Sequence, residues 1–340
     1  MAFVCRTEAD PVDELMREAL RHHPIPGAAL AVIKDGRIVK TNAYGLANLE
    51  WQTPVTLDTS FEIGSVTKQF TAAAILVLAQ EGRLSVDDVI SRHLPGTPAT
   101  WRQITLRHLL THTSGLKNYT GLPGFELTRH LTQSQFVAQI AAHALEFPPG
   151  ARWSYCNTGY NLLGYVVENV SGTNYVAFLQ QRLFTPLQMT ATTSRDPGAV
   201  IPHRANGYET NATGQFINRD FDLTDIFSAG EIVSTVGDLA KWNVALDTGK
   251  ILTPASREEM WTPVRLNDGS SHPYGFGWFL EPYQGHPNVG HSGATDGFSA
   301  SLQRFPEANL TVIVLCNSDE FDIATKLARQ IAVLEMKDGR

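Results

Sequence analysis

The chain has 340 residues, of which 43% are hydrophobic and 18% are charged. It is long enough for one large mixed fold or about two compact domains, and its composition is that of a folded globular protein. Acidic residues outnumber Lys and Arg by 34 to 27, which gives a formal net charge of -7, and no run of Lys and Arg forms a basic patch. Nucleic acids and anionic membrane surfaces are therefore not expected partners.

Apolar runs in this sequence are short. The run Leu310–Cys316, for example, falls far below the roughly 20 residues that a membrane-spanning helix needs. Residues 1–10 lack the charged and apolar segments of a secretory signal, so we expect a cytoplasmic protein, or a periplasmic or secreted one if a leader has been removed. Three widely spaced cysteines, Cys5, Cys156 and Cys316, argue against a disulfide framework.

The first predicted elements are a helix and a β-hairpin. Pro11–His23 has apolar residues at the spacing of one helical face, and two prolines follow closely. Ala28–Lys34 and Arg37–Tyr44 are rich in β-forming residues, and the pair Asp35 and Gly36 between them is a strong hairpin signal. An antiparallel sheet is therefore expected to begin here.

The middle of the chain is predicted to be mainly helical. Residues 65–80 are rich in Ala and Leu, and Gly82 follows them as a typical helix end. Pro-Gly turns interrupt the sequence from there to about residue 224. We interpret residues 65–224 as a helical insertion.

Strand signals return after Phe227. The expected strands are Tyr274–Leu280, a segment around His291, Ser299–Phe305 and Leu310–Cys316. A closing helical face follows, with apolar residues at positions 323, 327, 331 and 334. The predicted fold is α/β of the α+β type. An antiparallel sheet subdomain (residues 1–64 and 225–340) is flanked by N- and C-terminal helices and carries a mostly helical subdomain (residues 65–224).

A serine followed three residues later by a lysine opens the predicted helix at residue 65. A hydroxyl is a poor nucleophile near neutral pH and needs a neighbouring base and donors for the oxyanion that it creates. In the first turn of a helix Ser65 and Lys68 share one face, so the amine can reach the hydroxyl. The helix dipole and partial burial are expected to lower the pKa of this lysine. A second copy of the pattern, Ser114 and Lys117, lies among glycines and a proline and is interpreted as a turn.

Two more segments carry groups suited to the same chemistry. Tyr155 and Asn157 form the only Tyr-x-Asn of the chain, where a phenol could move protons and an amide could hold a carbonyl; alone, the segment would be interpreted as a helix N-cap. Residues 290–294, Gly-His-Ser-Gly-Ala, place glycines where a ligand could approach a strand edge. The similar His-Thr-Ser-Gly that begins at His112 is interpreted as a turn after a helix.

These three segments, in this order, resemble the serine β-lactamase and penicillin-binding-protein superfamily. The sequence is most similar to the class C branch, with its DD-peptidases, D-aminopeptidases and β-lactamase-like carboxylesterases. The resemblance spans nearly the whole chain and includes residues 61–70, 106–116 and 234–242. It implies a serine hydrolase with no cofactor and no metal, whose active site lies in the cleft between the two subdomains.

The resemblance also implies a role for each matched residue. Ser65 would be the acylated nucleophile, Lys68 its proton partner and Tyr155 the general base or acid. Asn157 would position the substrate carbonyl, the backbone N–H groups of Ser65 and Ala294 would form the oxyanion hole, and His291, Ser292 and Gly293 would line the binding strand.

The substrate preference is expected to depend on His291, because class C β-lactamases have a lysine there. A neutral imidazole holds a substrate carboxylate less strongly than an ammonium does. We therefore expect small esters, D-amino-acid amides or short D-peptides as substrates in preference to penicillins and cephalosporins. A β-lactamase and a penicillin-binding sensor that turns over slowly are the alternatives, since both would use the same residues. The oligomeric state is left open.

Four other features are given simpler interpretations. Glu231 would favour amine-bearing substrates if it faced the cleft, but a surface position is preferred. His108 and His112 lack the additional ligands of a zinc site and are interpreted as complementing a helix end. Cys156 is interpreted as a small buried side chain. The absence of a Gly-x-Ser-x-Gly motif disfavours an α/β-hydrolase.

Overall fold

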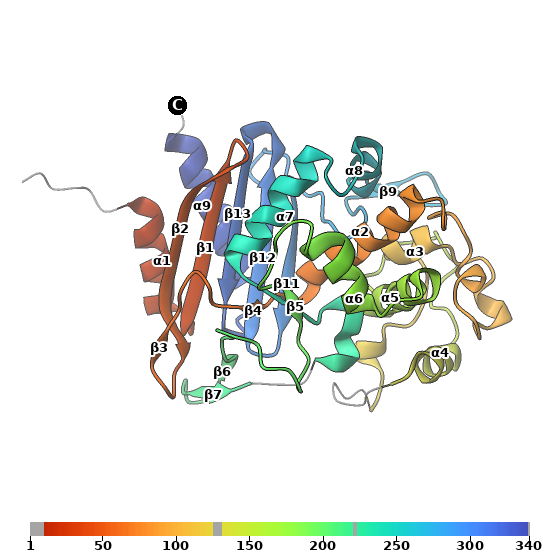
Figure 1. The fold of residues 1–340 in the computed structure, drawn as a ribbon, viewed down its shortest axis with the longest axis horizontal. Helices are drawn as coiled ribbons and strands as arrows, with labels where there is room; N and C mark the ends of the chain where they lie inside the picture. The colour runs from red at the N-terminus through yellow and green to blue at the C-terminus, as the bar shows by residue number, and fades with distance from the viewer. Residues whose placement is uncertain (1–9, 125–130, 220–222, 339–340) are drawn as a thin grey trace, which may run out of the picture.

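The structure, a computed structural model, describes residues 10–124, 131–219 and 223–338. Both ends of the chain build one antiparallel sheet in the order β11-β12-β13-β1-β2-β3 (Figure 1). Its strands are β1 (Gly27–Lys34), β2 (Arg37–Asn48), β3 (Thr53–Pro54), β11 (Val289–Thr295), β12 (Phe298–Phe305) and β13 (Leu310–Cys316). The predicted hairpin is confirmed, because Asp35 and Gly36 both have positive φ, as its tight turn requires.

Helices cover both faces of this sheet. α1 (Pro11–His22) and α9 (Ile323–Asp338) lie on one face, and α7 (Val236–Thr248) lies on the other (Figure 1). Side chains of β1 alternate between the two faces. Three pack beneath α1 and α9 (Ala28, Leu30 and Val32), and three pack towards α7 and α2 (Ala29, Ala31 and Ile33). The predicted sheet with flanking terminal helices is confirmed.

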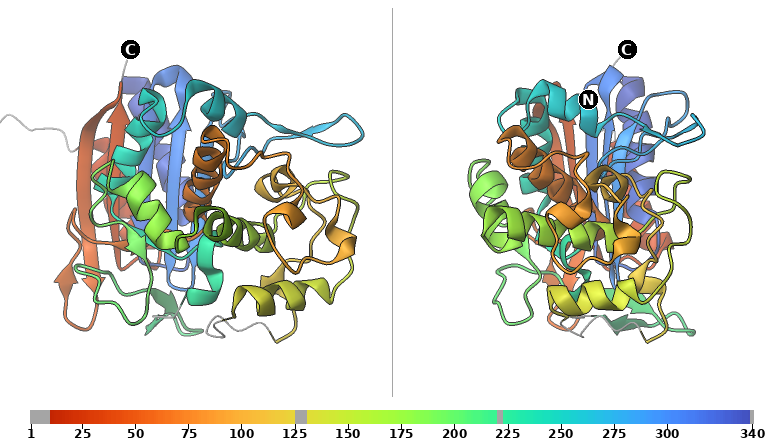
Figure 2. Two further views of the ribbon diagram at one scale, coloured as in Figure 1. Left: turned by 45° about the vertical axis from the view of Figure 1, so that its right-hand side comes forward. Right: turned by 90° about the vertical axis from the view of Figure 1, so that its right-hand side faces the viewer.

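The remaining helices gather beside β11, as Figure 2 shows. They are α2 (Thr67–Gln80), α3 (Leu106–Leu110), α4 (Gln133–Ala141), α5 (Asn157–Ser171), α6 (Tyr175–Leu179) and α8 (Pro254–Met260). α2 is buried on all sides from Thr67 to Leu78, which is typical of a helix in the centre of a core. None of the described helices is both long enough and apolar enough to cross a bilayer.

Part of the middle region is not helical as predicted. Residues 193–218 form three short strands, β5 (Thr193–Ser194), β6 (Tyr208–Thr210) and β7 (Phe216–Asn218). β5 and β4 (Phe61–Glu62) both pair with β8 (Ile232–Ser234), so this small sheet joins segments that are distant in the sequence. Strand pairing between distant segments leaves no pattern in the local sequence from which it could be predicted. The division into subdomains at residues 64 and 225 stays a prediction.

The predicted strand Tyr274–Leu280 is wrong. It follows the short hairpin of β9 (Val264–Arg265) and β10 (Ser271–His272), and it contains only isolated bridges, one of which pairs Tyr274 with Phe279. Gly277 has φ 78°, and a Cβ atom there would lie 2.7 Å from the carbonyl oxygen of Lys68. The segment therefore turns against α2 instead of extending.

The described cysteines match their predicted state. Cys156 and Cys316 are buried free thiols, and burial raises the pKa of both. Cys5, like the N-terminal segment discussed above, lies within residues 1–9, outside the described residues.

Candidate active site

Ser65 lies in a 3-10 turn, Gly64–Val66, that leads directly into α2. The α-helix thus begins at Thr67, two residues later than predicted. The turn leaves Ser65 partly exposed, whereas the Lys68 side chain is completely buried in the first turn of α2. The Nζ atom of Lys68 lies 2.9 Å from the Oγ atom of Ser65.

The Lys68 amine has two further hydrogen-bond partners. Nζ lies 2.8 Å from Oδ1 of Asn157 and 2.8 Å from the carbonyl oxygen of Ala229. A neutral amine has two N–H donors and one lone pair, so it can donate to these two oxygens and accept the Ser65 hydroxyl proton. Burial lowers the pKa of Lys68 well below its ordinary value, which favours this neutral form.

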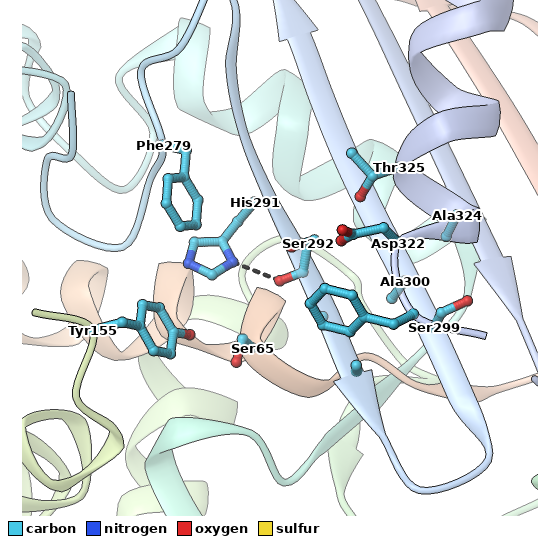
Figure 3. Close-up of a pocket in the computed structure, with 13 residues that line it drawn as sticks. Ser65, Tyr155, Phe279, His291, Ser292, Ser299, Ala300, Asp322, Ala324 and Thr325 are labelled. Atoms are coloured by element: carbon cyan, nitrogen blue, oxygen red, sulfur yellow. Dashed lines mark hydrogen bonds between the residues drawn. The ribbon is translucent and has the colours of Figure 1, made fainter. Parts of the chain in front are cut away.

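Tyr155 lies on the other side of Ser65. Its hydroxyl points towards Ser65 in Figure 3, and a hydrogen bond with Ser65 lowers the pKa of Tyr155. Burial acts in the opposite direction and more strongly, so the pKa of Tyr155 is raised overall. The Nζ atom of Lys68 lies 4.9 Å from the centre of the Tyr155 ring. Because its pKa is raised, the Tyr155 phenol keeps its proton before a substrate binds.

Two glycines let β11 approach the turn that carries Ser65. Gly64 has φ 49°, and a Cβ atom there would lie 2.6 Å from the backbone nitrogen of Ala294. A Cβ atom on Gly293 would collide with the carbonyl oxygen of Ile63 and lie 3.0 Å from the backbone nitrogen of Ser65. This close contact brings the amides of Ser65 and Ala294 together, as an oxyanion hole requires.

A buried chain of hydrogen bonds links the Tyr155 segment to β11. The backbone N–H of Cys156 donates to Nδ1 of His112 (3.1 Å), so Nε2 of His112 carries the proton and donates to the Tyr274 hydroxyl (3.1 Å). That hydroxyl can then donate to Nε2 of His291 (3.1 Å), whose Nδ1 donates to the carbonyl of Ser292 (2.6 Å). In this series of hydrogen bonds every donor has one acceptor, and both imidazoles are neutral.

Both imidazoles also have depressed pKa values. Burial, followed by repulsion from the Lys68 amine when that amine is protonated, lowers the pKa of His291 to about 3 and that of His112 well below its ordinary value. Neither ring therefore supplies a positive charge near neutral pH. As predicted, His112 lies in a turn after α3, but no contact of its ring with the other site residues was expected from the sequence.

A cavity of about 270 Å³ opens above Ser65 (Figure 3). Six of the eight predicted site residues line it, namely Ser65, Tyr155, His291, Ser292, Gly293 and Ala294. The other two, Lys68 and Asn157, do not line the cavity and are held together by their own hydrogen bond. Phe279 and Asp322 also line the cavity, and sequence reasoning identified neither.

The structure also decides the features that received simpler interpretations. Glu231 is buried, so the predicted surface position is wrong, but it does not line the cavity. It lies instead near Tyr175, whose pKa is raised first by burial and to a smaller extent by the charge of Glu231. Lys117, in the second Ser-x-x-Lys copy, pairs with Glu146 (2.8 Å).

The two histidines considered as metal ligands act otherwise. The ring of His108 contacts Thr105 at the start of α3, not at its end as predicted. Within residues 10–124, 131–219 and 223–338, no cluster of three or more His, Cys, Asp or Glu side chains is arranged to hold a metal ion.

Comparison with known families gives one match over most of the chain. The family described as Beta-lactamase matches residues 12–335. Among named relatives, Penicillin-binding protein 4* of Bacillus subtilis (strain 168) is 32% identical over 316 residues, which cover 88% of this chain and 69% of the relative. Protein flp of Staphylococcus aureus (strain MW2) is 30% identical, and the match covers 90% of this chain but 62% of that protein. The chain thus spans about two thirds of the length of these relatives.

Solved structures are similar over nearly the whole chain. The octameric penicillin-binding protein homologue from Pyrococcus abyssi has a TM-score of 0.84 at 29% identity, covering 96% of this chain and 77% of that one. The D-amino acid amidase from Ochrobactrum anthropi SV3 complexed with L-phenylalanine amide has a TM-score of 0.82 at 27% identity, covering 96% and 98%.

Proposed function

The chain belongs to the beta-lactamase family, whose members include serine hydrolases, and we propose that it hydrolyses esters or amides through an acyl-enzyme at Ser65. The observation that carries the proposal is the set of contacts around the buried Lys68 amine. Its two acceptors, Asn157 and Ala229, take both protons of a neutral amine and leave its lone pair directed at the Ser65 hydroxyl.

In the acylation step Lys68 acts as the general base. It takes the Ser65 proton as Oγ attacks the substrate carbonyl, and the N–H groups of Ser65 and Ala294 stabilise the oxyanion. Tyr155 then donates its proton to the leaving group as the tetrahedral intermediate collapses. The raised pKa of Tyr155 supports this role, because the phenol is protonated when the leaving group needs a proton.

The same pair completes the cycle. After acylation, Lys68 is an ammonium and Tyr155 a phenolate, and a proton passing from the first to the second resets both. Water then attacks the acyl carbonyl and gives up its proton to this pair, and Ser65 is released with its own proton restored. The enzyme itself neither gains nor loses a proton over the cycle.

The preferred substrates in this proposal are small esters, D-amino-acid amides and short D-peptides. Penicillins and cephalosporins carry a carboxylate, and His291 offers it no positive charge, since both ring nitrogens are occupied by hydrogen bonds. The D-amino acid amidase of Ochrobactrum anthropi SV3 is similar over 96% of this chain, which supports an amide substrate.

A substrate panel tests the proposal. We expect repeated turnover of p-nitrophenyl acetate, and of at least one D-amino-acid amide or D-Ala-D-Ala peptide, with much weaker turnover of nitrocefin. The Ser65→Ala variant serves as the blank. A single burst equal to the enzyme concentration would indicate the penicillin-binding sensor instead. Equal turnover by wild type and Ser65→Ala would refute the acyl-enzyme.

A further inference from the structure

We propose that Asp322 is the cation-binding residue of the active-site cavity and that it selects substrates with a positively charged amine. This inference rests on the proposed hydrolase function and adds the substrate class. Asp322 lines the same cavity as Ser65, and Figure 3 shows its carboxylate directed over β11 towards Ser292.

The backbone holds this carboxylate away from the helix that it precedes. Asp322 is the residue before α9, and its carbonyl accepts the N–H of Lys326 (2.9 Å) as an N-cap carbonyl does. An aspartate there would ordinarily cap the helix with its side chain. Asp10 does so before α1, where Oδ1 accepts the N–H of Val12 (2.9 Å).

Asp322 makes no comparable contact. It adopts the left-handed conformation, with φ 63°, and no hydrogen bond or ion pair to its carboxylate is found among the residues that the structure describes. Outside glycine, this conformation is uncommon and is tolerated best by Asn and Asp. The side chain is therefore available to a ligand in the cavity and is only partly exposed to water.

The charge of the cavity favours a cation. Asp322 is the one residue with a formal charge near neutral pH among the described residues that line the cavity, because His291 is neutral. Lys326 and Arg329 line the adjoining groove, but neither forms an ion pair with Asp322. An anionic substrate would therefore meet like charge beside Ser65, and a cationic one would meet opposite charge.

The apolar walls suit an amine with carbon substituents. Phe279 and Phe321 line the cavity, and Phe321 is 71% exposed at its rim. Aromatic faces attract ammonium groups, and more so where water is partly excluded. A primary or quaternary ammonium can thus contact a carboxylate and aromatic carbon in one site.

Two pairs of substrates of matched shape test the proposal. D-Alanine p-nitroanilide and 2-methylpropanoyl p-nitroanilide differ by an ammonium against a methyl group in the acyl part. Acetylthiocholine and S-(3,3-dimethylbutyl) thioacetate differ by a trimethylammonium against a tert-butyl group in the leaving group. We expect wild type to prefer the cationic member of at least one pair. Asp322→Asn should lower that preference in kcat/KM by about tenfold and change the neutral substrates by less than twofold.

Asp322→Asn tests the charge alone, because Asn has the same shape as Asp and also tolerates the left-handed backbone conformation. The matched control is Glu281→Gln, since Glu281 is exposed on the adjoining groove and does not line the cavity. Unchanged preference in both pairs for Asp322→Asn, or an equal fall in Glu281→Gln, would overturn the inference.

If the proposed hydrolase function is wrong, the same experiment gives a different result from the one that would overturn the inference about Asp322. Wild type would then turn over none of the four substrates. Binding of choline and of 3,3-dimethylbutanol to the Ser65→Ala variant, measured by calorimetry, still decides the inference in that case. Tighter binding of choline that is lost in the Ser65→Ala, Asp322→Asn double variant supports it, and equal binding of the two ligands refutes it.

Discussion

At Lys68, burial and hydrogen bonding act on the same atom in opposite directions. Burial disfavours the ammonium, and three oxygen neighbours within 2.9 Å favour it. These neighbours are a hydroxyl, an amide and a backbone carbonyl, and none carries a formal charge. Burial therefore dominates, and the pKa of Lys68 is lowered. In the proposed mechanism, burial of Lys68 and not a charged partner makes its amine a base.

The first prediction concerns this amine. Lys68→Met keeps an unbranched chain in a buried site but removes the base, so kcat/KM for p-nitrophenyl acetate should fall by about 10³-fold or more. Lys117→Met is the matched control, because Lys117 is the lysine of the second Ser-x-x-Lys copy and pairs with Glu146 at the surface. It should retain wild-type activity. Comparable losses in the two variants would contradict the assignment of Lys68.

The second prediction concerns the pH dependence of stability. The pKa of His291 is 6.5 ordinarily and about 3 in the folded protein, so between these values only the unfolded chain binds the proton. The contribution of His291 to the free energy of unfolding should therefore rise with pH up to about 6.5 and then level off. The slope from His291 alone is at most about 1.4 kcal/mol per pH unit.

Urea denaturation between pH 4.5 and 7.5 measures this slope. In His291→Gln the change of the free energy of unfolding per pH unit should decrease by the contribution of one proton. The contribution of His112, whose pKa is also lowered, should remain. Other groups titrate equally in both proteins and cancel in the comparison. Identical slopes in wild type and variant would show that His291 is protonated in the folded state.

Some residues of the candidate active site could be predicted from the sequence, and others could not, for a physical reason. Ser65 and Lys68 occur in a short pattern whose spacing reflects helix geometry, and Tyr155 and Asn157 occur in a short pattern just before and at the start of α5. Ala229 acts through a backbone carbonyl, which every residue has, so no residue type reveals it. Asp322 depends on its backbone conformation and on a cavity formed by distant segments, and neither has a local signature.

At the scale of elements, the site depends on how closely β11 approaches the turn before α2. The third prediction tests this contact. Gly293→Ala places a Cβ atom against the backbone of Ile63, which cannot move without moving Ser65. The oxyanion hole should open, and kcat should fall by about 10²-fold or more, measured with p-nitrophenyl acetate.

The same strand provides the control. The three atoms nearest to a Cβ atom on Gly290 all belong to the end of the Gln303 side chain, which can shift without moving the backbone, so Gly290→Ala should change kcat little. If the two variants lost activity equally, the loss would come from the strand as a whole and not from the contact with Ser65.

Elements were predictable where local chemistry determines them. The hairpin of β1 and β2 was predicted because Asp35 and Gly36 specify the turn by themselves. The segment after β10 was misread as a strand because its aromatic residues suggest one, whereas Gly277 bends it against the backbone of Lys68. That contact joins positions more than 200 residues apart, which no local pattern encodes.

At the scale of the whole molecule, β1 connects two hydrophobic clusters. One cluster lies beneath α1 and α9, and the other surrounds α2 and contains the buried Trp101, Trp242 and Trp278. Because neighbouring side chains of a single strand belong to different clusters, losing one cluster exposes half of β1. We therefore expect both clusters to unfold together.

The fourth prediction follows from this coupling. Ile331 lies on α9 with its side chain fully buried in the cluster without tryptophan, so Ile331→Ala should lower the free energy of unfolding by about 3 kcal/mol. Tryptophan fluorescence reports on the other cluster, yet its midpoint should shift by the same amount as far-UV ellipticity. Ile38→Ala is the control, since Ile38 is 50% exposed and should cost less than about 1 kcal/mol. An unchanged fluorescence midpoint, or two separate transitions, would mean that the terminal helices unfold independently of the active site.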